Sequence, residues 1–332
     1  MNTAVSGKDK STVYNCLKVL LTFLVVFAHA SRMYTGKGVI TPILSSNSLT
    51  LITNFIYSFH MKLYMAVSGM VYGLCVIEYK KYQDSFKFIK NKAKRLMIPY
   101  LFWGIVLVAP VMVACHFTDR TYLSYVFDGI ILANDNRHLW YIIVLFFIFC
   151  VFSVIRKWIE RINPIIILVI CLLVSYYQNK IVLPLSLNSF ANYILYFYLG
   201  YVINLYFEKV VRVVSNPLAV ILCFLINAYL FTKTGWIFSI LTGIFGSCFF
   251  IGITYHLSQI ISGIKFFDLL NKNGYGIYLF HSMIIYVLYY FLANTNIFPW
   301  ILCSLITVTA FFLSLFISIL IRKLRLRILI GE

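Results

Sequence analysis

The sequence predicts an all-α protein, a polytopic transmembrane helical bundle of about ten spans with both termini in the cytoplasm. Hydrophobic residues make up 62% of the 332 positions and charged residues only 11%, whereas soluble domains keep about a quarter of their residues charged. The apolar runs are about twenty residues long, which suits transmembrane helices. Because lipid offers no hydrogen bonds, the backbone must close its own in helices or in a barrel. Barrel strands are about ten residues of alternating polarity, so the barrel is excluded.

The expected spans follow one another without an intervening soluble domain. We find no internal repeat and no low-complexity tract, so we expect residues 1–332 to form a single transmembrane domain. In chain order the expected spans are 14–34, 52–77, 97–117, 138–155, 164–178, 191–207, 218–232, 236–257, 275–292 and 300–321.

Basic residues lie mainly on one side of this arrangement. Apart from Lys18 and Lys62, which lie inside spans, twenty of the 28 Lys and Arg residues fall on the side of the N-terminus. The six on the opposite side are Arg32, Lys37, Arg120, Arg137, Lys180 and Lys233. Cytoplasmic loops retain positive residues, so both termini are predicted to be cytoplasmic. The net charge of +18 follows from this topology, and we expect no nucleic-acid partner.

The cysteines do not indicate a metal or redox centre. All eight occur singly, nearly all within apolar runs. Since no pair has the spacing of metal ligands or of a redox motif, we interpret them as small apolar side chains. No metal site is predicted.

The first expected span carries a polar stripe. Lys18 and His29 are eleven residues apart, which leaves about 20° between them around a helix and about 16 Å along its axis. Thr22 and Arg32 fall near the same stripe. Ionisable groups within spans are costly and usually functional, so the stripe predicts a polar track from a lysine near the cytoplasm to an outer histidine. The alternative is that Lys18 extends to the cytoplasmic interface and His29 marks the outer helix end.

The second span carries a similar pattern. His60, Tyr64 and Ser68 follow one another at four-residue intervals and so share a helix face. We interpret Ser68 together with Gly69 as a small-residue patch for helix packing.

These residues belong to motifs that resemble those of acyltransferase family 3, the integral-membrane acyltransferases. In that family a basic residue precedes a histidine by eleven positions in the first helix. The resemblance covers almost the whole chain, and its motifs are YNCLKVLLTFLVVFAHA (14–30), SFHMKLYMAVSGM (58–70), KAKRLMIPYLFW (92–103), HLWYIIVLFF (138–147) and NGYGIYLFHS (273–282). The sequence departs from the family at three positions. Lys18 replaces the usual arginine, Asn15 stands where an acidic residue is frequent, and Lys62 replaces a proline.

The resemblance implies the transfer of an acyl group, commonly acetyl from cytoplasmic acetyl-CoA, to a hydroxyl. The expected acceptor is a glycan or a lipid-linked saccharide. With the family pattern, His29 is predicted to act as the general base. Because the spans offer no acidic partner for a Ser-His-Asp arrangement, we favour direct attack by the acceptor hydroxyl over an acyl-enzyme. Acetyl-CoA is thus expected as a donor substrate, and no cofactor is expected to be bound.

Other side chains receive binding roles. Lys18 and Arg95 are expected to pair with the phosphates of CoA, the alternative being ordinary positive-inside anchoring. Arg32 and His60 are expected to position the acceptor or polarise the thioester carbonyl, unless they serve only helix-end hydrogen bonds.

Three further candidates lie in the later motifs. Trp140 is expected to stack on a sugar or contact the donor, or to be an interfacial anchor. His281, with Tyr278 one turn earlier, is placed nearer the cytoplasmic end of its span. We interpret it as a donor-site contact or a core histidine rather than a second base. His116 and His256 are interpreted as structural.

The main alternative function is a transporter, flippase or polysaccharide polymerase, since polar tracks also form conduits. Transporters often show repeated halves or matching broken helices, and the sequence shows neither. A catalytically inactive scaffold is disfavoured by the presence of Lys18 and His29. The family resemblance favours a multi-pass protein of a bacterial inner membrane, and the oligomeric state stays open.

Overall fold

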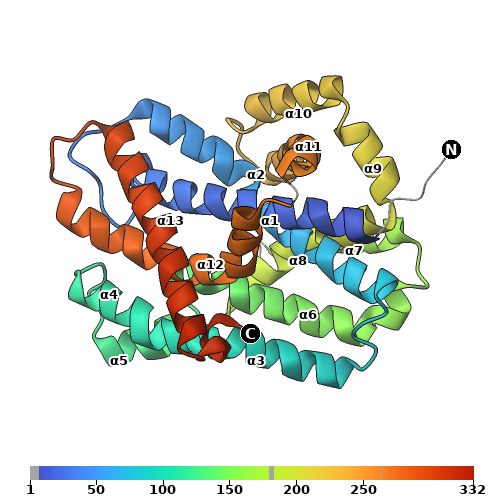
Figure 1. Ribbon diagram of the computed structural model, residues 1–332, viewed down its shortest axis with the longest axis horizontal. Coiled ribbons are helices and arrows are strands. Elements are labelled where there is room, and N and C mark those ends of the chain that lie inside the picture. The colour runs from blue at the N-terminus through green and yellow to red at the C-terminus, as the bar shows by residue number, and fades with distance from the viewer. Residues whose placement is uncertain (1–6, 179–182, 262) are drawn as a thin grey trace.

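The computed structural model describes residues 7–178, 183–261 and 263–332, and all regular elements in these ranges are helices. The all-α prediction is therefore confirmed for the described residues. Lys180, counted above among the outer cations, lies outside them. Figure 1 shows the arrangement. The longer helices are α1 (Gly7–Ser31), α2 (Asn47–Gly73), α3 (Ser85–Trp103), α6 (Trp140–Ile159), α7 (Pro164–Tyr177), α8 (Leu187–Leu205), α10 (Pro217–Leu230), α11 (Trp236–Ile261), α12 (Lys265–Leu292) and α13 (Pro299–Lys323).

Short helices extend or connect these elements. The α-helical ones are α4 (Ala109–Ala114), α5 (Tyr122–Ser124) and α9 (Phe207–Val214). The 3₁₀ and π turns are η1 (Arg32–Thr35), η2 (Leu74–Glu78), η3 (Gly104–Val108), η4 (Tyr125–Ile131), η5 (Arg137–Leu139) and η7 (Arg327–Ile330).

Seven helical segments of the described chain are long and apolar enough to cross a membrane, or eight if α8 and α9, which meet at a bend of 100°, form one span. α7 and α10 each contain 14 residues, about 21 Å, which is shorter than a hydrocarbon core of about 30 Å. Each of the ten expected spans coincides with helix. The count of ten and the cytoplasmic termini stay predictions, because the bundle itself does not fix where the membrane lies.

The outer surface of the bundle is apolar. Leu123, Trp158 and Ile260 are between 71% and 76% exposed, and many other large apolar side chains are exposed with them. A soluble monomer rarely leaves large contiguous apolar patches in water. Lipid is the solvent that such a surface suits, so the protein is an integral, multi-pass membrane protein.

Local sequence signals begin several of the helices. Asp84 caps α3 by accepting from the backbone of its first turn. Asn163 and Asn216 do the same for α7 and α10, each followed by a proline in the first turn. Such caps satisfy donors that a helix N-terminus otherwise leaves free. They place the helix starts independently of tertiary packing.

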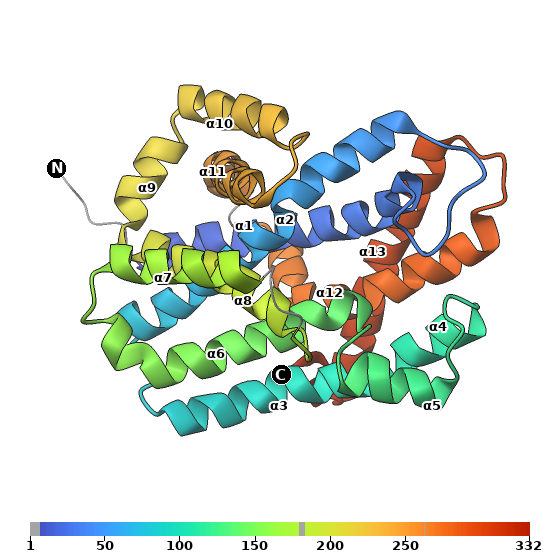
Figure 2. The same cartoon turned by 180° about the vertical axis from the view of Figure 1, so that it is seen from behind.

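α1 lies at the centre and packs against α2, α11, α12 and α13. In Figures 1 and 2, α3 and α6 run side by side on one flank of it, and α9, α10 and α11 lie on the opposite flank. Residues of α1 are therefore surrounded by protein on several sides. This placement brings the polar stripe of the first helix into the interior.

α2 and α8 touch through their backbones. A side chain at Gly69 would overlap the carbonyl of Phe197, and one at Gly200 would overlap the carbonyl of Ala66. Small residues allow membrane helices to approach this closely. The expected packing role is confirmed for Gly69, whereas Ser68 points elsewhere, as described below.

Lys62 is buried between α2 and α11 and has no carboxylate partner among the described residues. Its ammonium donates to the carbonyl of Ser58 at 2.9 Å and to the carbonyl and hydroxyl of Ser239 at 2.5 and 2.9 Å. Three acceptors match the three donors of an ammonium group. Lys62 lies two positions after His60, about 200° around the helix, so the two side chains leave it on nearly opposite faces.

Candidate active site

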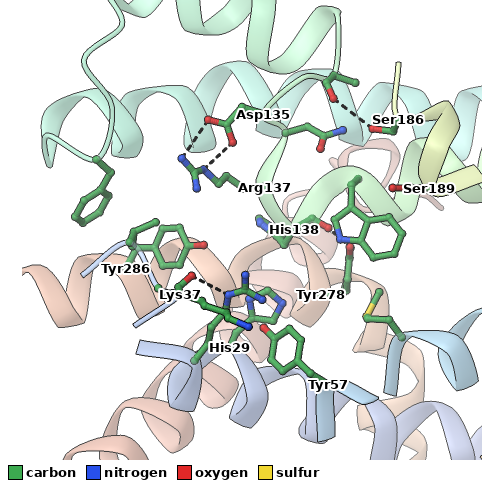
Figure 3. A pocket seen from close by; sticks show the side chains of 18 of the residues that line it. His29, Lys37, Tyr57, Asp135, Arg137, His138, Ser186, Ser189, Tyr278 and Tyr286 are labelled. Atoms are coloured by element: carbon green, nitrogen blue, oxygen red, sulfur yellow. Dashed lines mark hydrogen bonds and ion pairs between the residues drawn. The ribbon is translucent and has the colours of Figure 1, made fainter. Parts of the chain in front are cut away.

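A cavity of about 590 Å³ opens between α1, α2, η5 and α12, and we call it the histidine cavity. Figure 3 shows His29 and Tyr57 on one side of it and Asp135 and Arg137 on the other. Its polar and aromatic lining includes His29, Arg32, Lys37, Tyr57, His60, Asn134, Asp135, Asn136, Arg137, His138, Trp140, Ser186, Ser189, Tyr193, Tyr278 and Tyr286. The lining combines titratable groups with aromatic faces and amides, which suits a polar organic ligand.

Three imidazoles from different elements meet beside this cavity, which is lined by His29 and His138 but not by His281. The ring centroids of His29 and His281 are 5.0 Å apart, and those of His281 and His138 are 5.3 Å apart. His60 lies on the far side of Tyr57, whose ring is 4.7 Å from it and 6.4 Å from His29. α1, η5, α12 and α2 thus each contribute one histidine.

Backbone carbonyls fix the tautomers of three of these rings. His60 Nδ1 and His281 Nδ1 each lie 2.8 Å from a carbonyl one turn earlier in their own helix. His138 Nε2 lies 3.0 Å from the carbonyl of Leu279. A carbonyl accepts only, so each contacting nitrogen carries the proton and the other nitrogen is an acceptor. In the described part of the chain these second nitrogens are buried and have no partner, so each is an acceptor without a donor.

Arg32 is held at the rim of the cavity. Its guanidinium lies 4.9 Å from the ring centroid of Tyr57, and its Nε donates to the carbonyl of Lys37 at 3.1 Å. Such stacking on an aromatic face orients a guanidinium without using most of its donors.

The opposite wall is formed by the segment before α6. Asp135 pairs with Arg137 at 3.0 Å, and burial raises the pKa of this carboxyl although Arg137 opposes the effect. Trp140 packs against Tyr193, with ring centroids 4.8 Å apart. The hydroxyl of Tyr278 donates to the carbonyl of His138. An ion pair and aromatic surfaces therefore face the histidines across the cavity.

A second cavity of about 400 Å³ lies between α1, α3, α12 and η7, and we call it the basic cavity. Its cationic lining is Lys18, Lys92, Arg95, Lys272 and Arg322. The ammonium of Lys92 lies 4.4 Å from the ring centroid of Phe149. Clustered Lys and Arg side chains of this kind are suited to phosphate groups.

The segment that follows α13 contributes to the basic cavity. Arg95 Nε donates to the carbonyl of Gly331 at 2.6 Å. Arg322 donates to both carboxylate oxygens of Glu332, at 2.5 and 3.1 Å. These hydrogen bonds hold the pKa of Glu332 below its ordinary value, although burial opposes the shift. Glu332 therefore stays ionised and forms an ion pair with Arg322, one of the five cations of the cavity.

Three tyrosines separate the two cavities, and we call Tyr64, Tyr141 and Tyr278 the tyrosine septum. Their ring centroids lie between 5.3 and 6.4 Å apart. Tyr64 lines the basic cavity and Tyr278 the histidine cavity. The hydroxyl of Tyr141 bonds to Ser68 at 2.7 Å and that of Tyr64 to Thr22 at 3.2 Å. The septum is thus made of rings that carry polar groups and are tied by hydrogen bonds.

All but one of the predicted site residues line these two cavities, the exception being His281. The histidine cavity is lined by His29, Arg32, His60, Trp140 and Tyr278. Lys18 and Arg95 line the basic cavity. The sequence predicted one continuous polar track from Lys18 to His29, whereas the structure has a cavity at each end and the septum between them. The difference arises because α2, α6 and α12 each direct a tyrosine toward the middle of α1.

His281 is fully buried and lines neither cavity. Its ring packs against that of His29, so it is a core histidine behind the histidine cavity rather than a contact in the basic cavity. The expected span began at residue 275, but α12 begins at Lys265. The helix therefore contains ten residues before the expected start of the span.

Several lining residues were not singled out from the sequence. Tyr57 and His138 lie within or beside quoted motifs, and a search for aromatic and imidazole side chains near His60 and Trp140 would have found them. Three others, Lys92, Lys272 and Arg322, count in the sequence only among the Lys and Arg residues that set the orientation of the protein in the membrane. The charge rule accounts for such residues without indicating that they converge.

The described residues contain no group of three or more His, Cys, Asp or Glu side chains arranged to hold a metal ion. The model for a family described as an acyltransferase domain matches residues 13–323, nearly the whole chain. No curated protein and no solved structure matches the chain.

Proposed function

The chain belongs to the acyltransferase domain family and is thus a membrane acyltransferase; we propose that it transfers an acetyl group from acetyl-CoA to a hydroxyl of a glycan or lipid-linked saccharide, with His29 as the general base. The observation that carries this proposal is the position of His29. It lines one cavity, contacts a second imidazole, and is separated by the tyrosine septum from a cavity rich in cations.

The basic cavity is the proposed donor site. Lys18 and Arg95 bind the phosphates of CoA there, and charge-assisted hydrogen bonds to phosphate are among the strongest that side chains form. Lys92 and Lys272 line the same cavity and add to its positive field. In this proposal the thioester end of the donor passes the tyrosine septum to reach His29.

The chemical step takes place in the histidine cavity. His29 accepts the proton of the acceptor hydroxyl as its oxygen attacks the thioester carbonyl, which forms the new C–O bond. His60, whose Nε2 is an acceptor in the tautomer set by the carbonyl of Ile56, positions the acceptor by accepting a hydrogen bond from another of its hydroxyls. The tetrahedral intermediate then loses the CoA thiolate as the C–S bond breaks. The thiolate takes the proton from His29, so no residue is left acylated.

The acceptor binds in the remaining part of the histidine cavity. Trp140 offers an aromatic face to a sugar ring, and Arg32 lies one turn beyond His29 to position it. Amides and hydroxyls at the opposite wall supply further hydrogen bonds to a saccharide. With cytoplasmic termini this cavity faces outward, which suits a surface glycan of a bacterial inner membrane.

The transporter alternative finds no specific support. The bent pair α8 and α9 is a candidate broken span, but transporters place such breaks at the binding site. The bend follows Leu205, and neither cavity is lined by residues of α9. We therefore propose only the acyltransferase function.

The test is acetyl transfer by the protein purified in detergent and returned to liposomes. Labelled acetyl-CoA is supplied with glycan extracted from the membranes that carry the protein. The unmodified protein should label the glycan, and His29→Ala should abolish labelling while the purified variant keeps its helical circular dichroism. His256→Ala is the matched control, since this histidine is exposed and bonds to Ser215. Full activity of His29→Ala would remove His29 from the reaction.

A further inference from the structure

Two cations of the histidine cavity have no anionic partner. The cavity is lined by Arg32, Lys37 and Arg137, and by the single carboxylate of Asp135. That carboxylate is fully engaged, since Arg137 contacts one oxygen at 3.0 Å and the other at 3.1 Å. Across the described ranges, neither Arg32 nor Lys37 forms an ion pair. The cavity therefore presents positive charge without a counter-charge.

The geometry of Arg32 suits a ligand that approaches from the cavity. Its guanidinium carbon lies over the ring of Tyr57, and its Nε donates to the carbonyl of Lys37. A guanidinium carries five N–H donors in a fixed fork. The stacking and the single backbone bond hold this fork in place and leave further donors available. The same backbone bond brings the chain of Lys37 next to Arg32.

The spacing from His29 limits where the anion lies in the ligand. Arg32 follows His29 by three residues, which is about 4.5 Å along a helix. An acceptor that presents a hydroxyl to His29 would bring a neighbouring substituent, on the same or the next sugar ring, to Arg32. A charge elsewhere in a long glycan could not bind Arg32 while the reacting hydroxyl faces His29.

We propose that the acceptor is anionic, and that its carboxylate or phosphate binds Arg32 and Lys37 while a nearby hydroxyl faces His29. This inference rests on the proposed function. A neutral saccharide would cover a half-buried guanidinium without replacing its hydration by an opposite charge, which is unfavourable. A carboxylate or a phosphate instead forms charge-assisted and bidentate hydrogen bonds with it.

The experiment compares three forms of one glycan preparation as acceptors in the liposome assay. The first is native, the second has its carboxyl groups reduced to alcohols, and the third is dephosphorylated. We expect one of the two treatments to lower the acetylation rate by about 10-fold or more at limiting glycan, as loss of a charge-assisted contact predicts. The treatment that has this effect identifies the anion as carboxylate or phosphate.

Variants connect the effect to the two cations. Arg32→Gln and Lys37→Gln should acetylate native and neutralised glycan at similar rates, because the cation that discriminates between them is removed. Arg32→Lys keeps the charge without the fork and should retain part of the preference. Lys233→Gln is the matched control, an exposed lysine outside the cavity, and should discriminate as the unmodified protein does.

Three outcomes would overturn the inference, and they differ from a failure of the proposed function. Equal acetylation of all three glycan forms by the unmodified protein would leave acetyl transfer standing and remove the anion requirement. Unchanged discrimination in Arg32→Gln and Lys37→Gln would remove these residues. If Arg32→Gln instead lowered the use of succinyl-CoA relative to acetyl-CoA, the anion would belong to the acyl group. No label in any glycan would refute the proposed function itself, and the inference with it.

Discussion

The two cavities hold their polar side chains in different ways. At the histidine cavity, His60, and His281 behind it, are oriented by carbonyls of their own helices. In the basic cavity, Arg95 and Arg322 are bound by the segment that contains Gly331 and Glu332. Gly331 lies 236 residues from Arg95 in sequence, and Glu332, the anion of the segment, lies 10 residues from Arg322. The histidine contacts lie within single helices, whereas η7 and the residues after it are held by a few hydrogen bonds to other helices. The comparison predicts that changes in the first cavity affect turnover, and that changes in the second affect donor binding.

The largest effect is expected from His281→Phe. This change keeps a ring against His29 but removes both ring nitrogens, so His29 loses the polar ring that packs 5.0 Å from it. We expect kcat to fall by about 100-fold, with the KM for acetyl-CoA unchanged and the pH profile of kcat displaced. The measurement is steady-state acetylation of the native glycan over a range of pH. A change confined to the donor KM would show that His281 serves the basic cavity after all.

A smaller effect is expected from Lys18→Ala. Loss of one charge-assisted contact to a CoA phosphate should raise the KM for acetyl-CoA by about 10-fold or more and leave kcat nearly unchanged. Lys209→Ala, an exposed lysine outside both cavities, is the matched control. An unchanged KM would return Lys18 to a role in anchoring the helix at the membrane interface.

The smallest effect is expected from Glu332→Gln, measured by hydrogen exchange in η7. The contact with Arg322 is partly exposed, and such pairs contribute little, so exchange should accelerate only about two- to fivefold. Because the pKa of Glu332 is lowered by Arg322, the unmodified contact should persist through the usual titration range of a glutamate. It should be lost only as the pH falls through the lowered value. Loosening already at the ordinary glutamate pKa would contradict this assignment.

Sequence patterns predicted the parts of this structure that depend on one helix at a time. The spacing of Lys18 and His29 placed both on the interior face of α1, and the motifs indicated Trp140 and Tyr278 as lining residues. Gly69 signalled a close helix approach. Each of these follows from helical periodicity or residue size.

Other parts depend on how helices meet. The septum requires Tyr64, Tyr141 and Tyr278 to converge from three helices, and no periodicity within one helix reports such convergence. α12 begins ten residues before the expected span. A polar segment can continue a helix beyond the hydrophobic stretch, so hydropathy alone places such boundaries poorly.

The backbone contact between α2 and α8 limits how the septum can open. The carbonyl of Phe197 lies against Gly69, and the carbonyl of Ala66 lies against Gly200. Neither helix can therefore slide or rotate alone without its backbone overlapping the other. α2 carries both His60 and Tyr64, so these side chains are mounted on a rigid two-helix frame. Passage of the proposed thioester donor would then require rotation of tyrosine rings or displacement of α6 or α12, and not movement of α2 by itself.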